Sequence, residues 1–429
     1  MSRSSILRLF LAVAMLASAM PAHADWTGLG LDNVKPPEMK YGPVEFHPYL
    51  KLSEIYDSNI FLNPSHGPVV GNNANNNLAG PQLGSWIHTL NAGVKVGAQI
   101  AEMHRLDLAY DMVYKAYSKD PRSNNTVNQG VDAMYSYKGP MGFGGHLKDT
   151  YVNTVDPATS ELTQRTRRWN NTAGIDGEYA PEGGNLFGGV DLNESVDKYV
   201  SNPATAVLLD RYTQLFGFKA GYLVMPKTRA YLAYHRQVIH YTDHPGAPSK
   251  NNKAHLLDFG VEGELAPKLT GQVQTGLQYR NYDDAPTVGA KRITRNWMVA
   301  TNLNYRPLER TKATLSLSRS LQESTFGANQ FYIASSAGLN VTHKLPWKVT
   351  AGVNAGIEQD KYPLTSTVGT TVVNRRDDLY QVGANLDYDI QEWLKAGLNY
   401  EYRTRFSHAL SEQFNYRDHV TGITIGATF

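Results

Sequence analysis

Residues 379–406 read LYQVGANLDYDIQEWLKAGLNYEYRTRF, and this stretch decides the fold. Alternate positions from Tyr380 to Ile390 are apolar, and the positions between them are polar or glycine. The alternation resumes at Leu394, where apolar residues share one face while lysine, glutamate and arginine occupy the other. This period of two predicts β-strands. Because one face is apolar and the other fully charged, the stretch indicates a hairpin with lipid outside and water inside.

The same pattern recurs along the whole chain in eighteen segments. Segments of this length span a bilayer when they are tilted. The expected strands are 44–57, 86–100, 104–117, 127–138, 143–155, 169–180, 186–199, 211–224, 228–241, 254–265, 268–282, 292–306, 311–322, 330–343, 347–361, 376–390, 393–406 and 416–429.

The connections between these segments alternate strictly between short and long. Proline ends strands in the short ones, as at 139–142, 225–227, 266–268, 306–309 and 344–347. The long ones are polar and cover 62–84, 118–126, 156–168, 200–210, 242–253, 283–291, 323–329, 362–375 and 407–415. Short periplasmic turns and longer external loops are typical of outer-membrane barrels. We therefore expect an all-β, transmembrane, antiparallel up-and-down barrel of about 18 strands, within 16 to 20, with both termini periplasmic.

The N-terminal residues carry the features of a secretory signal. Arg3 precedes an apolar stretch from Ile6 to Met20, and Ala22-His23-Ala24 forms a cleavage site before Asp25. Residues 1–24 are thus expected to be removed, which places the mature protein in the outer membrane of a Gram-negative bacterium. Residues 25–43 contain several prolines and are expected to be irregular, either hanging in the periplasm or tucked into the lumen. The barrel then covers 44–429.

Composition excludes several classes of protein. The chain of 429 residues has no Cys, hence no disulfide, no thiol nucleophile and no cysteine for a lipid anchor. Without Arg3 and Arg8, its 41 basic residues become 39 and match 39 acidic ones, which argues against a nucleic-acid partner. No enzyme, phosphate-loop or cofactor motif is present. His240, His244 and His255 lie near one long loop and could meet a metal, although we interpret them as loop and rim residues.

A decapeptide at the end of the first strand, Leu52–Phe61, reads LSEIYDSNIF. Its ending resembles that of outer-membrane beta-barrel porins encoded beside exopolysaccharide synthesis genes. The resemblance implies an outer-membrane conduit, in some members linked to polysaccharide export, and supplies no catalytic residues. From the residues alone, we expect a tyrosine at the membrane interface and a turn held by side-chain bonds to the backbone, with ligand binding as the alternative. The residues concerned are Tyr56, Asp57, Ser58, Asn59, Ile60 and Phe61.

Charged residues on the inward face indicate a water-filled lumen, unless loops or residues 25–43 plug it. We expect the lumen to be lined by Lys51, Lys95, Asp107, Asp111, Asp191, Glu262, Arg280, Asp387, Asp389, Lys395, Glu401, Arg403 and Arg405. Across the hairpins, Lys395 should meet Asp387 or Asp389, and Asp418 should meet Arg403 or Arg405. Two arginines against one aspartate would leave a positive excess and a weak preference for anions.

Further basic residues gather toward the external end. They are Arg165, Arg167, Arg168, Lys291, Arg292, Arg295, Arg375 and Arg376. Two interpretations remain open: binding of lipopolysaccharide phosphates from outside the barrel, or a basic funnel that recruits anionic solutes or polymer. The terminal Phe429 follows an amphipathic strand and resembles the signal that the barrel-assembly machinery reads.

Three classes of function follow from these features. The first is a channel or conduit that passes polysaccharide or another polar or anionic solute across the outer membrane. The second is a plugged barrel that acts as a receptor, an adhesin or a scaffold of an export complex. The third is an enzyme at the barrel rim, for which no catalytic arrangement is found. No outward patch in the sequence indicates a subunit interface, so a monomer and a trimer both remain open.

Overall fold

A computed structural model describes most of the predicted barrel and its connections. It covers residues 39–64, 82–162, 165–200, 209–242, 248–285, 291–325, 329–368, 371–408 and 414–429. The predicted signal peptide, the first part of the irregular segment and His244 lie outside these described residues.

The described residues form a sequence of antiparallel strands with very little helix. The elements are β1 Met39–Tyr41, β2 Val44–Asp57, β3 Ser85–Ala101, β4 His104–Tyr117, α1 Pro121–Asn124, β5 Thr126–Lys138, a 3-10 turn at Pro140–Gly142, β6 Phe143–Thr154, β7 Arg168–Tyr179, β8 Leu186–Tyr199, β9 Arg211–Met225, β10 Thr228–Tyr241, β11 Asn252–Ala266, β12 Leu269–Tyr282, β13 Ile293–Leu308, β14 Thr311–Glu323, β15 Phe331–Lys344, β16 Val349–Lys361, β17 Ser366–Val368, β18 Thr371–Val373, β19 Arg376–Asp389, β20 Leu394–Ser407 and β21 Tyr416–Thr428.

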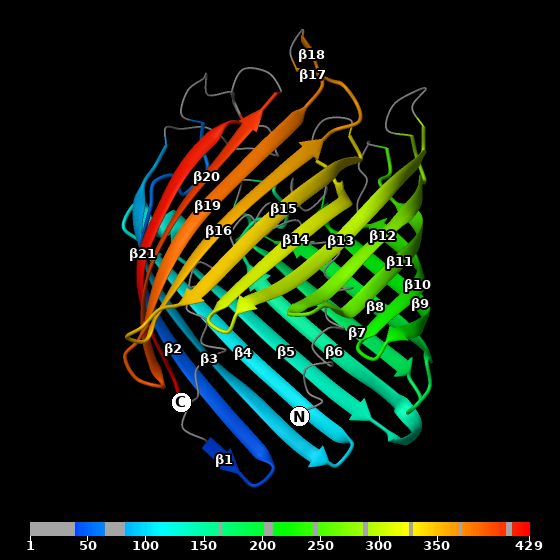
Figure 1. Cartoon of the computed structure of the whole chain (residues 1–429). Coiled ribbons are helices and arrows are strands. Elements are labelled where there is room, and N and C mark those ends of the chain that lie inside the picture. The colour runs from blue at the N-terminus through cyan, green and yellow to red at the C-terminus, as the bar shows by residue number, and fades with distance from the viewer. Residues whose placement is uncertain are drawn as a thin grey trace.

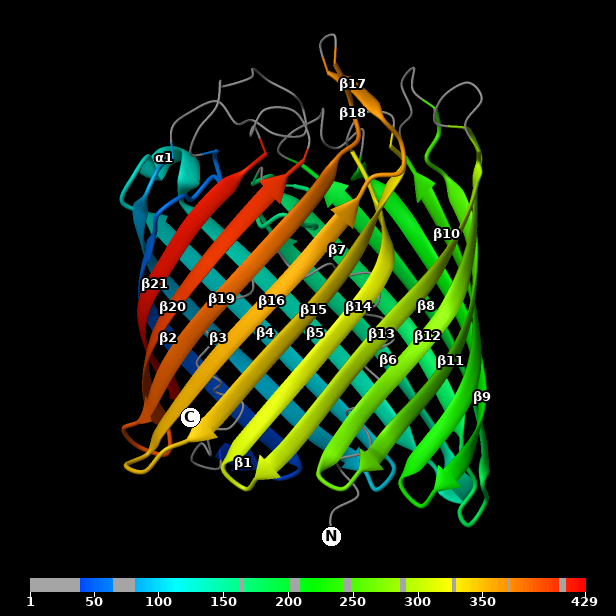
Figure 2. The same ribbon diagram turned by 45° about the horizontal axis from the view of Figure 1, so that its top comes forward.

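The sheet closes on itself as a barrel (Figures 1 and 2). Its 19 strands include the short β1, and the other eighteen form the ring. Each strand pairs with its neighbour in the chain, and β21 completes the ring by pairing with β2 from Tyr49↔Thr428 to Asp57↔Val420. Closure leaves none of these eighteen strands as a free edge, which a single bilayer-spanning sheet requires. The predicted fold class and strand number are therefore confirmed.

The eighteen ring strands agree with the predicted segments to within two residues at each end. Three short elements differ from expectation. Residues 25–43 were expected to be irregular, but Met39–Tyr41 pairs with β2 beyond the point where β21 ends. The long loops 118–126 and 362–375 contain α1 and the β17–β18 hairpin respectively. These elements are too short to show the alternation that identifies a membrane-spanning strand in the sequence.

The two rims of the barrel differ in the length of their connections. At one rim, which we call the short-turn rim, the turns are tight and use left-handed backbone at Met141 (φ 59°), Lys268 (φ 65°) and Trp347 (φ 60°). The other, the long-loop rim, carries α1 and the β17–β18 hairpin (Figure 2). Which rim faces the periplasm remains a prediction from these loop lengths.

The two faces of the wall differ in chemistry as the alternation predicts. On the outer face, large apolar side chains are exposed, for example Leu398 at 53%, Val353 at 56% and Ile423 at 60%. Aromatic pairs lie near both rims, with Phe143 against Tyr179 at the short-turn rim. Charged residues occupy the inner face, where they pair with one another. In the described ranges, no helix is both long and apolar enough to cross a membrane.

Candidate functional site: a lumen crossed by the β6–β7 loop

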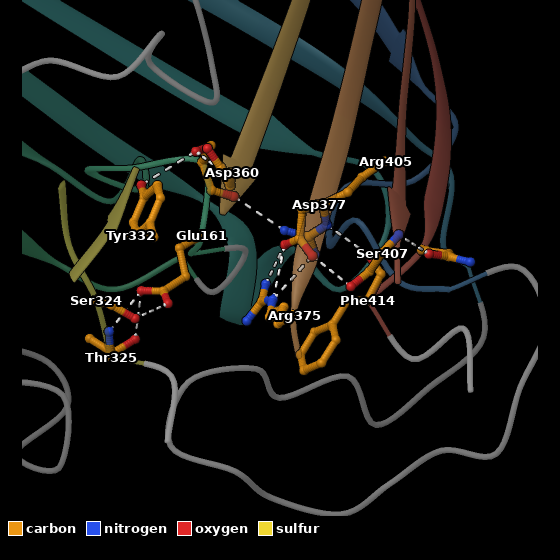
Figure 3. Close-up of polar contacts among 12 residues, drawn as sticks. Glu161, Ser324, Thr325, Tyr332, Asp360, Arg375, Asp377, Arg405, Ser407 and Phe414 are labelled. Carbon is orange, nitrogen blue, oxygen red and sulfur yellow. Dashed lines mark hydrogen bonds and ion pairs between the residues drawn. The ribbon is translucent and has the colours of Figure 1, made fainter. Parts of the chain in front are cut away.

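The loop between β6 and β7 crosses the lumen to the opposite wall. In the ring that starts with β2, strands β6 and β7 are fifth and sixth, whereas β16 and β19 are fifteenth and sixteenth of eighteen. The two pairs therefore lie on opposite sides of the barrel (Figure 2). Ser160 of this loop nevertheless contacts Asp360 of β16 and Arg405 of β20. Glu161 contacts Ser324 of the β14–β15 loop (Figure 3). The loop thus narrows the lumen near the long-loop rim.

Glu161 is the main attachment of this loop. Its side chain is 2% exposed. One carboxylate oxygen accepts a hydrogen bond from Ser324 Oγ at 2.7 Å, and the other accepts bonds from Thr325 N at 2.8 Å and Thr325 Oγ1 at 3.0 Å. Because three donors from one loop converge on a buried carboxylate, this contact fixes the β6–β7 loop against the β14–β15 loop.

Ser160 and Leu162 extend the attachment to β16 and β20. The Ser160 hydroxyl donates to Asp360 Oδ2 at 3.1 Å, and its carbonyl accepts from Arg405 Nη1 at 3.2 Å. Leu162 is buried and lines, with Glu358 and Arg403, a small cavity of about 50 Å³. The loop therefore packs against the wall through apolar as well as polar contacts.

A second loop contact supports the same region. Lys250, in the β10–β11 loop, donates to the Ser324 carbonyl at 2.6 Å. Burial lowers the pKa of Lys250 from its ordinary value. Nearby, Gln330 donates to the Asp284 carbonyl at 3.0 Å. The β14–β15 loop that receives Glu161 is thus itself anchored by two neighbouring loops.

The wall around this attachment carries an excess of acid. Its buried bases are Arg375, Arg403 and Arg405, and its buried acids are Asp57, Glu161, Glu358, Asp360, Asp377, Glu401 and Asp418. Among the described residues, seven buried carboxyl groups thus lie around three buried guanidinium groups. The expected positive excess at Arg403 and Arg405 is therefore wrong. The alternation of the strands predicted only Asp418 as an acidic neighbour of these arginines. Ring closure and the curvature of the strands bring further acidic residues from β2, β16 and β19 close to them.

Arg403 and Arg405 have different partners from those expected of a charged entrance. Arg403 forms an ion pair with Asp418, and Asp57 and Glu401 lie 3.8 Å and 3.6 Å from its guanidinium. Arg405 is 1% exposed and donates to the carbonyls of Phe414, at 2.7 Å, and Ser160. Arg403 thus holds neighbouring strands of the wall together, and Arg405 holds two loops against the wall. The expected anion preference loses its basis.

The other residues expected in the lumen are mostly paired. Lys395 lies 3.3 Å from Asp389, while Asp387 accepts from Asn385 at 2.7 Å. The remaining contacts join Arg105 to Asp107, Tyr49 to Asp111, His235 to Asp191, Arg229 to Glu262, Arg280 to Glu323, and Lys51 to the Tyr49 ring. Lys95 is exposed on the inward face of β3. Paired charges of this kind stabilise the wall while keeping it polar.

A second part of the wall is polar but uncharged. We call it the neutral wall; it comprises uncharged inward residues of β13–β16, and the charged residues Lys312, Glu358 and Asp360, which point inward from the same strands, border it. The neutral wall consists of Thr294, Asn296, Asn302, Asn304, Thr314, Ser316, Ser318, Ser320, Gln322, Ser336, Asn340, Thr342 and Asn354. Their side chains bond one another across strands, as from Thr314 Oγ1 to Asn304 at 3.0 Å. Outward positions of these strands belong to residues such as Trp297. Asn302, Ser318 and Asn340 point the other way, into the lumen, and they are exposed there. Exposed inward amides and hydroxyls indicate open lumen beside this wall.

Most of the arginines expected to form an external basic rim contact other residues of the chain. Arg375 is 1% exposed, pairs with Asp377 at 2.6 Å and lies over the Tyr362 and Phe414 rings. Burial lowers its pKa, but the neighbouring Tyr362 and Asp377 raise it above the ordinary value. Arg375 is thus a buried support of the long-loop rim. The expectation of an exposed rim residue is wrong there because the loops fold over it.

The remaining basic rim residues differ in exposure. Arg167 donates to Val127 O, Thr126 Oγ1 and Asn153 Oδ1, and burial lowers its pKa. The other contacts are Arg165 over the Tyr117 ring, Arg168 with Asp156 and Asp197, Arg292 with Asp283, Arg295 over the Tyr279 ring, and Arg376 with Asp378. Lys291 is exposed.

The YDSNIF hexapeptide lies where the first and last strands meet. Asn59 is 0% exposed; its amide donates to Asn63 O at 2.8 Å and to Arg417 O at 3.1 Å, and it accepts from Asn63 N at 2.9 Å. Asp57 accepts from Asn59 N at 2.8 Å, and Ser58 Oγ bonds both Asp418 and His419 N. Ile60 packs on Val420, Phe61 beside it, and Tyr56 lies 5.3 Å from Trp86. The hexapeptide thus stabilises the contact between the first strand, β2, and the last strand, β21, which we call the seam of the barrel.

The last residue also lies on this seam, at the short-turn rim. Phe429 N donates to Pro48 O at 2.9 Å, and its ring stacks on Trp393 at 5.7 Å.

Of the histidines considered as metal ligands, His255 bonds Tyr234 at 2.7 Å. No group of three metal-ligating side chains occurs among the described residues.

Comparison with known proteins places this barrel in a family. A model of the family described as "Putative beta-barrel porin 2" matches residues 181–429, which is more than half of the chain. The chain belongs to this porin family. The resemblance drawn from the hexapeptide is therefore confirmed at the level of the family, and the porin is an outer-membrane protein. No curated protein matches the chain.

Several solved structures are distantly similar to this porin. OpdQ from Pseudomonas aeruginosa is 8% identical with a TM-score of 0.46, covering 90% of this chain and 97% of that one. A mutant of the ferric enterobactin receptor PfeA from Pseudomonas aeruginosa is 9% identical with a TM-score of 0.44, covering 90% and 80%. A bacterial polysaccharide outer membrane secretin is 10% identical with a TM-score of 0.36, covering 89% and 98%.

The residues that attach the β6–β7 loop were not found from the sequence. Ser160 and Glu161 lie in a polar loop without periodicity, and their partners are 163 to 245 positions away. One signal was present: Leu162 is an apolar residue in a loop expected to be polar. A buried apolar anchor in a long loop indicates that the loop packs on the protein.

Proposed function

We propose that this porin is a channel for uncharged, polyhydroxylated solutes, with sugars or oligosaccharides as the substrate class. The neutral wall carries this proposal. Amide and hydroxyl groups can both donate and accept hydrogen bonds, so they exchange readily with the hydroxyls of a passing sugar. A wall without net charge neither attracts nor repels such a solute over long range.

The β6–β7 loop bears on the size of the solute. Because it attaches to the opposite wall, it divides the lumen near the long-loop rim and favours solutes smaller than the full bore. The family resemblance drawn from the sequence favours polysaccharide, and an unbranched chain moving past the neutral wall fits this geometry. A barrel kept closed by the same loop, acting as a receptor or a scaffold of an export complex, is the second candidate.

The proposal includes the path to the membrane and the orientation there. Residues 1–24 direct secretion, the barrel-assembly machinery inserts the chain, and the short-turn rim faces the periplasm. Exposed basic residues such as Arg295 contact lipopolysaccharide phosphates from the outer face. An epitope inserted within 362–375 should react with antibody on intact cells, whereas one at Pro226 should react only after permeabilisation.

Solute uptake by proteoliposomes tests the function. Swelling rates are compared for a neutral trisaccharide and a sugar acid of equal size, using purified protein and empty liposomes. We expect faster entry of the neutral sugar. The double variant Asn302→Asp/Asn340→Asp should slow the sugar acid more than the neutral sugar, because it charges the neutral wall. Asn302→Gln/Asn340→Gln, which changes the same two side chains without adding charge, is the matched control. Absence of swelling with any solute would favour the closed barrel.

A further inference from the structure

The outer face of the barrel carries a patch that does not suit lipid. Cross-strand pairing aligns Asp149 of β6, Ala173 of β7, Glu194 of β8 and Gln214 of β9 in one row. All four point outward, alternate with inward residues, and are exposed. Most other outward residues in the middle of the wall are large and apolar. The row therefore interrupts the apolar surface on one side of the barrel.

Aromatic residues show the depth of this row. On the outer face of β6, Phe143 lies beside Tyr179 at the short-turn rim, and Tyr151 lies 6.2 Å from Trp169 toward the long-loop rim. Along β6, Asp149 lies between these two aromatic pairs. With about 3.3 Å per residue and a tilt near 40°, Asp149 lies about 15 Å above Phe143, within a band about 25 Å tall. Asp149 also lies about 5 Å below Tyr151 and accepts a hydrogen bond from Asn171 Nδ2 at 2.9 Å, so its carboxylate is destabilising in lipid by less than one at the middle of the band.

The row also forms the floor of a groove. The groove has a volume of about 600 Å³, and small or polar side chains such as Ala133, Ala173 and Gln214 line it between Leu147 and Leu192. On β10 and β11 the outward positions carry large apolar side chains instead of small or polar ones. We call Leu232, Leu257 and Phe259, which are 60%, 57% and 49% exposed, the apolar ridge. A groove and an apolar ridge thus lie side by side on the same outer face.

A positive charge lies beyond the row, at the edge of this ridge. Arg236 of β10 points outward, is exposed, and pairs with Phe216 of β9 and His255 of β11. Glu194 and Arg236 are separated by β9 and by two residues along the strand, which places them about 12 Å apart across the sheet. Among the residues that the structure describes, neither Glu194 nor Arg236 forms an ion pair. Two opposite, unpaired charges on a membrane-facing surface call for partners outside this chain.

We propose that this face is the interface with a second copy of the chain, in which Glu194 of one copy pairs with Arg236 of the other. A rotation axis along the membrane normal, passing near β9, brings the β8 side of one barrel against the β10 side of its neighbour. The same rotation places the ridge of one copy against the groove of the other. Charge and shape are then complementary together, and both charges leave the lipid.

The absence of cysteine from the sequence makes this interface testable by disulfide formation. The double variant Glu194→Cys/Arg236→Cys should form disulfides between copies on mild oxidation in native membranes. A disulfide within one chain is excluded, because the two positions are about 12 Å apart and a disulfide needs Cα atoms within about 7 Å. The matched control is Val353→Cys/Leu398→Cys, two outward positions that flank β19 on the other side of the barrel. We expect cross-linked species from the first pair and none above background from the second.

Charge reversal tests the pairing itself. Mass measurement in lipid nanodiscs should show an oligomer for the wild type, and Glu194→Arg or Arg236→Glu should lower its fraction at least fivefold. The combined swap Glu194→Arg/Arg236→Glu should restore the oligomer. Heat-modifiable gel mobility verifies that each variant is folded; should a reversal variant not fold, the cysteine pair decides. A monomeric wild type, equal cross-linking by the control pair, or a swap that does not restore assembly would overturn the proposal. The first result would indicate that lipid or another protein covers the groove.

Discussion

Release of the β6–β7 loop is the sharpest consequence of the geometry described above. The change is Glu161→Ala, which removes the carboxylate that accepts from Ser324 Oγ and from the amide and hydroxyl of Thr325. The contacts of Ser160 with Asp360 and Arg405 remain. We therefore expect the loop to leave the opposite wall more often and the lumen to widen.

The size of this effect follows from the three lost bonds. Hydrogen bonds to charged groups contribute about 1.5–3 kcal/mol each, but they share one carboxylate that regains hydration when the loop is free. A net loss of about 2 kcal/mol is reasonable, and it changes the ratio of attached to free loop by about 30-fold. A loop attached nearly all the time in the wild type would then spend an easily measured fraction of time free.

Single-channel recording in planar bilayers measures this fraction as the time spent at the higher conductance level. Removing the donors instead, by Ser324→Ala/Thr325→Val, should act in the same direction and less strongly, because the Thr325 backbone amide remains. Glu54→Ala is the matched control, since Glu54 is an exposed glutamate that pairs with His88 on the outer face. Equal conductance and equal gating in folded Glu161→Ala and wild-type protein would refute the view that this carboxylate holds the loop.

Three further outcomes are expected. Asn59→Ala should lower the free energy of unfolding by about 2–3 kcal/mol, because it removes three buried hydrogen bonds at the seam; urea unfolding measures it, with the exposed Asn340→Ala as control, and equal effects of the two would contradict the seam role. Deletion of Phe429 should slow assembly, since it removes the bond to Pro48 and the stack on Trp393; slower appearance of heat-modifiable protein is the measure, and wild-type kinetics would count against an assembly signal. Arg403→Gln should raise the preference for cations in reversal-potential measurements at low salt, because it removes one of three positive charges from an acidic wall; a shift toward anions would show that this wall does not set selectivity.

The strands illustrate how far sequence reasoning reaches in this protein. Lys395 and Asp389 were expected to meet across the β19–β20 hairpin, and they do so at 3.3 Å. The hairpin places partners a few residues apart in the chain, so parity and turn length are enough to align them. Arg403 was expected near Asp418 for the same reason, and the two pair. Its other neighbour Asp57 comes from the first strand, 346 residues earlier, and no local pattern could locate it.

The sequence by itself determined the all-β barrel, its eighteen strands and the division of their residues between two faces. It could do so because each spanning strand meets lipid on one side and water on the other, and this requirement acts residue by residue along the strand. Only the tertiary structure decided that Glu161 crosses the lumen, that acids outnumber arginines around Arg403, and that Asp149 and Glu194 share an outward groove with Gln214. These features depend on ring closure and on the register between strands, which bring together residues that the chain keeps far apart.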